Sequence, residues 1–76
     1  MRKPTSRNRK ILAENIRNYR CRKNLSQEKL AEVCGLHRTF IGSIERAERN
    51  VTLSTLEVLA TAFNVQVPDL LIRKSK

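Results

Sequence analysis

Residues 26–46, SQEKLAEVCGLHRTFIGSIER, decide the fold of this chain. The stretch contains two short segments with helical apolar spacing, residues 27–34 and 38–45, separated by a turn at Gly35. A glycine at that point can adopt the positive φ that ends a helix with little strain. Ser26 can cap the first segment, because its hydroxyl can accept a hydrogen bond from a backbone N–H of the first turn. The stretch therefore predicts a helix-turn-helix.

The side chains of these two segments divide into an apolar face and a polar face. The apolar face should hold the two helices at a fixed angle, and Ala31 is small enough to let them cross closely. Its members are Leu30, Ala31, Cys34, Leu36, Phe40, Ile41 and Ile44. The outer face of the second segment carries Arg38, Thr39, Gly42 and Ser43. A helix arranged in this way can place its outer face in a DNA groove.

Three more helices are expected around this motif, which makes the predicted fold an all-α, five-helix domain. The first covers residues 8–24 and carries one apolar stripe. The fourth begins with Thr52 or Ser54 as its N-cap and ends at Asn64. The fifth is short and has Pro68 at its first position, where the missing N–H is no loss.

The positive charge of the chain lies mainly at its two ends. The net charge is +9, and the first ten residues hold five arginines and lysines while the last four hold three. We therefore expect a basic, flexible arm at residues 1–9, the five-helix domain at 10–72 and a basic tail at 73–76. The charge favours a polyanionic partner. The arm is a solubilising tail, an addition to the DNA contacts, or both.

Other kinds of chemistry find little support in the composition. The chain has one histidine, His37, and two cysteines, Cys21 and Cys34, without a CxxC motif, so neither a metal nor a cofactor is expected. No credible set of nucleophile and base is available, so we expect no enzyme. Both thiols should be free in a reducing cytoplasm. No apolar run approaches the length needed to span a membrane.

The polar residues of the motif divide into those expected to contact bases and those expected to contact phosphates. Arg38, Thr39 and Ser43 lie near the N-terminal half of the second segment, the part of a recognition helix that reaches base edges. Arg38 can make a bidentate contact with guanine, and Thr39 can touch a thymine methyl group. Gly42 would let a DNA strand approach the backbone closely. The expected phosphate contacts are Gln27, His37, Arg46, Arg49 and Asn50.

Arg38 and an acidic strip on the first helix of the motif also have simpler interpretations. Taken alone, Arg38 could be an ordinary exposed arginine at the start of a helix, and only its place in the motif favours a base contact. Glu28 and Glu32 share the outer face of the preceding helix. Such an acidic strip is usually a solvated surface, although RNA polymerase could contact it if the protein activates transcription.

The motifs SQEKLAEVCGL and IGSIERAER resemble the Cro/C1-type helix-turn-helix family of bacterial and phage regulators. The resemblance covers about residues 11–71, and the run GLHRTFIGSIERAERNVTLSTLEVLA is most similar to the controller proteins of restriction-modification systems. It implies a lambda-repressor-like fold. It also implies a homodimer on a palindromic operator in double-stranded DNA, which controls the expression of restriction-modification genes.

The resemblance further implies roles for individual residues. Arg20 and Glu45 should form a structural pair between the first and third helices, so that Glu45 would not contact DNA. The end of the chain should build the dimer interface from Val65, Val67, Leu70, Leu71 and Ile72. An antitoxin or a prophage repressor, with a protein partner as well as DNA, is the main alternative. General binding to RNA or to a membrane surface through the basic ends is a third.

Overall fold

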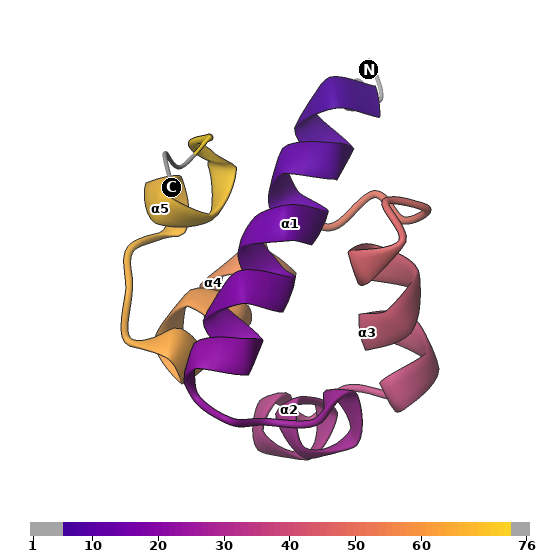
Figure 1. Cartoon of the computed structure of the whole chain (residues 1–76), viewed down its shortest axis with the longest axis vertical. Helices are drawn as coiled ribbons and strands as arrows, with labels where there is room; N and C mark the ends of the chain where they lie inside the picture. Colours follow the sequence, from indigo (N-terminus) through magenta and orange to yellow (C-terminus); the bar gives the residue numbers. More distant parts are fainter. Residues whose placement is uncertain (1–5, 74–76) are drawn as a thin grey trace.

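The computed structural model describes residues 6–73, and this part of the chain is all-α (Figure 1). Its helices are α1 (Ser6–Arg22), α2 (Gln27–Cys34), α3 (Arg38–Glu45), α4 (Leu53–Phe63) and α5 (Val67–Leu71). The predicted five-helix fold is therefore confirmed. None of these helices is long and apolar enough to cross a membrane.

The boundaries expected for the two helices of the motif are confirmed, while those of the first helix differ. α1 runs over Ser6–Arg22 instead of residues 8–24. Its early start means that residues 6–9, which we expected in a flexible arm, are helical, and Arg9 is hydrogen-bonded to the loop after α3. The remainder of that arm, residues 1–5, and residues 74–76 of the basic tail lie outside the described residues.

Each of the first four helices ends in the same local structure, with one residue in the left-handed region. These residues are Asn24, Gly35, Ala47 and Asn64, with φ between 57° and 68°. In each case the next residue donates its N–H to the carbonyl five positions earlier, at 2.8–3.0 Å. This Schellman arrangement satisfies carbonyls that a helix end leaves free. Asparagine and glycine adopt the conformation readily, so Ala47 is the exception.

The helix starts are capped largely as the sequence predicts. Ser26 accepts from the N–H of Lys29 at 2.9 Å. Of the two candidates at the start of α4, Thr52 is the cap, and it accepts from the N–H of Thr55 at 3.2 Å. Pro68 lies second in α5, one position later than expected, because α5 begins at Val67.

The core lies between α1 and the other four helices. In Figure 1, α1 crosses in front of α4, with α3 on one side, α5 on the other and α2 at its lower end. The buried apolar residues of this core are Leu12, Ile16, Leu30, Ala31, Ile41, Ile44, Leu56, Leu59, Ala60, Phe63 and Leu70. The Tyr19 ring stacks on Phe63 with 5.4 Å between centroids. Every helix therefore contributes to a single core.

The apolar residues predicted for the dimer interface differ in how far the core buries them. Leu70 is fully buried, and Val65 and Val67 are half-buried against the core. Leu71 and Ile72 remain 44% and 54% exposed. The assignment of Leu70 to a dimer interface was therefore wrong, because α5 folds back onto α1 and α4 and turns this side chain inward.

Replacing Ala47 by glycine should raise the free energy of unfolding by up to about 1 kcal/mol. The left-handed conformation costs an L-residue about 1–2 kcal/mol, and the greater freedom of glycine in the unfolded chain offsets about 0.4–1 kcal/mol of the gain. Urea denaturation measures the difference.

Gly35→Ala is the reverse control, since a Cβ built at Gly35 meets nothing within 4 Å and only the backbone conformation is tested. The free energy of unfolding of this variant should be about 1 kcal/mol lower than that of the parent. An Ala47→Gly variant no more stable than the parent would show that Ala47 is not strained.

Candidate nucleic-acid interface

The carboxylate of Glu45 joins three helices. Arg20 of α1 donates to both of its oxygens, with Nε–Oε2 at 2.6 Å and Nη2–Oε1 at 3.0 Å. Gln27 of α2 donates from Nε2 to Oε1 at 3.1 Å. The side chains of Arg20 and Glu45 are only 15% and 4% exposed. The structural pair implied by the family resemblance is therefore present, and it buries the carboxylate among partners within the protein.

The geometry of this pair favours the charged form of Arg20. The hydrogen bond to Glu45 raises the pKa of Arg20 above its usual value, against the opposing effect of burial. A forked contact of this kind is the strongest arrangement of guanidinium and carboxylate. Arg20 also donates from Nη1 to the carbonyl of Leu25 at 2.8 Å, which fixes the turn between α1 and α2.

Two further arginines of α1 contact the end of the recognition helix, and the sequence analysis did not identify them. Arg17 donates to the carbonyl of Glu45 at 3.4 Å. Arg9 donates to the carbonyl of Ala47 at 3.3 Å and to Oδ1 of Asn50 at 3.2 Å. Cations are favoured at the negative end of a helix dipole. The eight-residue spacing of Arg9 and Arg17, which places both on one face of α1, was the available signal.

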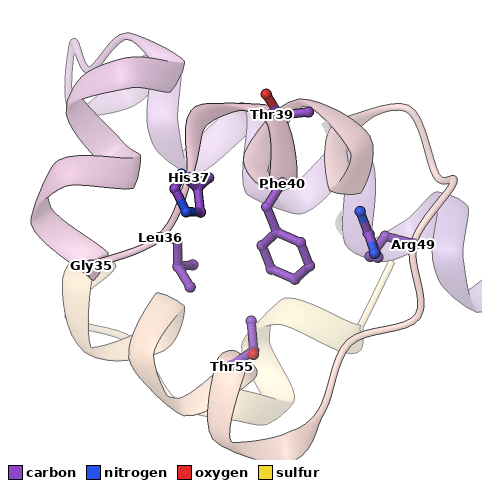
Figure 2. Close-up of a pocket in the computed structure, with 7 residues that line it drawn as sticks. All are labelled: Gly35, Leu36, His37, Thr39, Phe40, Arg49 and Thr55. Atoms are coloured by element: carbon purple, nitrogen blue, oxygen red, sulfur yellow. The ribbon is translucent and has the colours of Figure 1, made fainter.

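The first turn of α3 is open to solvent, as the motif predicts. His37, Arg38 and Thr39 are all exposed. In Figure 2, Thr39 points away from the helix on the side opposite the Phe40 ring. His37 occupies the N-cap position, although its side chain makes no capping hydrogen bond. The polar groups of this turn are therefore available to a ligand in a groove.

Ser43 does not lie on the outer face of α3 as expected, and its assignment as a base contact was wrong. The residue is 7% exposed. Its hydroxyl donates to the carbonyl of Phe40 at 2.7 Å and accepts from Nε of Arg49 at 3.3 Å. The hydroxyl therefore has two partners within the protein, and Arg49 covers it.

Gly42 is likewise not the bare backbone that the sequence suggested. It is buried, and a Cβ built there would lie 3.1 Å from Nη1 of Arg46 and 3.6 Å from Oε1 of Gln27. Two side chains assigned to phosphates thus meet over this glycine. The absence of a side chain at Gly42 therefore leaves room for Arg46 and Gln27.

Arg49 folds back over α3 beside a shallow hollow. Its guanidinium carbon lies 5.0 Å from the centre of the Phe40 ring, a cation–π contact. Figure 2 shows Phe40 pointing between the start of α3 and Thr55 of α4, with Arg49 next to the ring. The hollow is lined by Gly35, Leu36, His37, Thr39, Phe40, Arg49 and Thr55. Phe40 is therefore only half-buried and borders the recognition surface.

The other predicted phosphate contacts differ in how firmly the protein holds them. Arg46 pairs with Glu48 at 3.1 Å, and both side chains are more than half exposed. An exposed pair of this kind contributes little stability, so Arg46 can exchange Glu48 for a phosphate at small cost. Asn50 is exposed and held by Arg9. The five predicted phosphate contacts therefore do not form one cluster. Gln27 and Arg46 lie beside Gly42, His37 and Arg49 line the hollow, and Asn50 is held by Arg9.

The remaining polar groups of the described residues do not suggest another kind of site. No group of three or more metal-binding side chains occurs between residues 6 and 73. Cys21 and Cys34 are free thiols, as expected, and burial raises the pKa of Cys34. Cys34 is therefore held as a neutral thiol and acts as an apolar packing residue.

A short helix exposed along its first turn and packed on a second helix across a glycine turn defines the helix-turn-helix class of DNA-binding proteins. A family model described as helix-turn-helix matches residues 16–70. The chain belongs to the Cro/C1-type helix-turn-helix family, whose members are DNA-binding transcriptional regulators and not enzymes.

Similar proteins include several control proteins. Control protein C.SmaI of Serratia marcescens is 69% identical over 64 residues, which cover 84% of this chain and 76% of that protein. Control protein C.BamHI of Bacillus amyloliquefaciens is 47% identical over 68 residues, which cover 88% and 84%. The crystal structure of the restriction-modification controller protein C.AhdI from Aeromonas hydrophila matches with a TM-score of 0.80 at 37% identity, covering 86% of this chain and 94% of that one.

Replacing Glu45 by alanine should lower the free energy of unfolding by about 3 kcal/mol, because it leaves the shielded Arg20 guanidinium without its counterion. Urea denaturation followed by circular dichroism measures the loss. Glu48→Ala is the matched control, since it breaks an Arg–Glu pair on the surface and should change stability by less than about 0.5 kcal/mol. Similar losses in the two variants would refute a structural role for the Arg20–Glu45 pair.

Proposed function

We propose that this protein is a cytoplasmic, sequence-specific regulator of transcription that binds double-stranded DNA as a homodimer and controls restriction-modification genes. The observation that carries the proposal is the exposed first turn of α3, with Arg38 and Thr39 available and the helix braced from behind through Glu45. The similarity to control proteins supports the assignment to restriction-modification genes.

We assign the contacts to DNA from the exposure and the hydrogen-bonding groups of each side chain. Arg38 and Thr39 contact base edges, with Arg38 the stronger determinant because its fork matches guanine. Gln27 retains an amide N–H after its bond to Glu45 and donates it to a phosphate. The other phosphate contacts are His37, Arg46, Arg49 and Asn50. These contribute affinity that depends on salt and little preference for sequence.

A homodimer explains how so short a helix can select an operator. Two copies related by a twofold axis would place their α3 helices in successive major grooves about 34 Å apart, on an inverted repeat. The exposed Leu71 and Ile72 at the end of α5 supply an apolar patch that a second copy can cover. Half-buried Val65 and Val67 flank this patch in our proposal.

If the protein activates transcription, we propose that RNA polymerase contacts the acidic surface of α2. Glu28 and Glu32 on α2 are exposed. Glu32 is paired with Lys29 at 2.9 Å, an exposed contact that a basic partner can displace. These carboxylates lie on α2 and not on α3, so the proposed base contacts do not use them.

Arg38→Ala should weaken binding to the operator about 10–100-fold and leave binding to random DNA nearly unchanged, because a bidentate base contact is worth about 1–3 kcal/mol. Fluorescence anisotropy on DNA from upstream of the protein's own gene and on a scrambled duplex measures both. Equal weakening on the two sequences would exclude the base contact.

Arg46→Ala is the matched control and should behave differently. It should weaken binding to both duplexes alike and reduce the slope of log affinity against log salt by about 1, since one phosphate contact is lost.

A footprint without an inverted repeat would contradict the proposed homodimer.

Leu71→Asp should shift the protein from dimer to monomer while leaving the fold intact, because the side chain is 44% exposed in one copy. Sedimentation equilibrium measures the association. Val33→Asp on α2, at a residue 56% exposed, is the control and should leave the dimer unchanged. A Leu71→Asp variant that associates as tightly as the parent would place the interface elsewhere.

A further inference from the structure

Asn15, in the middle of α1, is a buried polar residue whose role the DNA-binding site does not explain. It is 2% exposed. Its amide nitrogen donates to the carbonyl of Leu70 at 2.9 Å and to the carbonyl of Ile72 at 2.9 Å. Both amide hydrogens are therefore spent on the last turn of α5, more than fifty positions away in the sequence.

α5 needs an external constraint of this kind. The helix has five residues, too few to be stable in isolation, and the backbone at Ile72 is extended. Leu70 anchors the helix in the core and Val65 and Val67 pack against it, but apolar contacts are not directional and fix the orientation of the helix only loosely. Two hydrogen bonds to carbonyls on either side of Leu71 fix that orientation, because they require defined angles.

α1 connects this constraint to the recognition helix. One side of α1 holds α3 and its following loop, through Arg9, Arg17 and Arg20. Another side holds α5 through Asn15. Figure 1 shows α1 between these two helices. The direction of the exposed Leu71–Ile72 patch relative to α3 is therefore set through α1.

We propose that Asn15 is a positioning residue that sets the half-site spacing the dimer accepts, by fixing the Leu71–Ile72 patch relative to α3. The inference rests on the proposed function. The two copies of the proposed dimer are joined through this patch and related by a twofold axis. A small rotation of α5 in each copy therefore displaces both recognition helices relative to the axis. At about 17 Å from a twofold axis, half the 34 Å between grooves, a rotation of about 10° moves each helix by about 3 Å. That distance is about one base-pair step.

The test uses an inverted repeat that the wild-type protein selects from a random-sequence DNA library. Duplexes are then made with the selected spacing and with one or two base pairs added or removed between the half-sites. The affinity of the wild-type protein should be about 10–100-fold higher for the selected spacing than for the altered ones, an effect similar to that of a mismatched base pair. In Asn15→Ala and Asn15→Ser this preference should fall to about threefold or less, with looser dimers in sedimentation equilibrium.

A duplex with a single half-site separates positioning from damage to the fold. The variants should bind it within about twofold of wild type, because the hydrogen bonds of Asn15 go to the end of α5 and not to α3. Asn15→Ser is included because a small hydroxyl leaves a milder defect than alanine if the latter folds poorly. Ile16→Val, a mild change at the next buried position, should keep the spacing preference.

The outcomes distinguish this inference from the proposed function. Asn15 variants that keep the spacing preference, or that lose half-site binding in parallel, would overturn the positioning role alone. Selection of a motif without an inverted repeat by the wild-type protein would overturn the proposed homodimer, and the positioning role with it. A relaxed spacing preference with intact half-site binding and an unaffected Ile16→Val variant supports the role of Asn15.

Discussion

The ion pair between Arg20 and Glu45 is the constraint on which the rest of the structure depends. Helices of eight residues are marginal by themselves, so α2 and α3 take their stability from what they pack against. A non-directional apolar core brings them together, and the forked contact to Glu45, with Gln27 as a third member, fixes their orientation. A charge buried in this way is costly unless it is fully paired. The network therefore admits one arrangement of three helices.

This bracing changes what the positive charge of the protein means. Arg9, Arg17 and Arg20 all make contacts within the protein. They set the shape of the recognition surface more than they add to its affinity. Arg38 is the exposed guanidinium in the first turn of α3. On the proposed function, a protein with a net charge of +9 therefore owes its sequence selectivity to very few side chains.

The sequence was most informative where short-range signals agree. Ser26, Gly35 and the apolar spacing within each segment predicted the bounds of α2 and α3, because caps and periodicity act within one or two turns. It failed for Ser43, which periodicity places outward but which Arg49, from the following loop, covers. It also missed Asn15, whose partners lie more than fifty positions away. Helical periodicity describes one helix at a time and carries no information about what a loop or a distant helix lays across it.

The repeated helix ends bear on how fast the chain becomes active. Four helices stop at a left-handed residue followed by the same backbone hydrogen bond, so each helix length is encoded by its own few residues. Helical domains dominated by such local contacts fold within about microseconds to milliseconds. Encounter of two copies is a second-order step that slows as the protein becomes scarce. On the proposed homodimer, the interval between synthesis and DNA binding is then timed by the concentration of the protein and not by its folding.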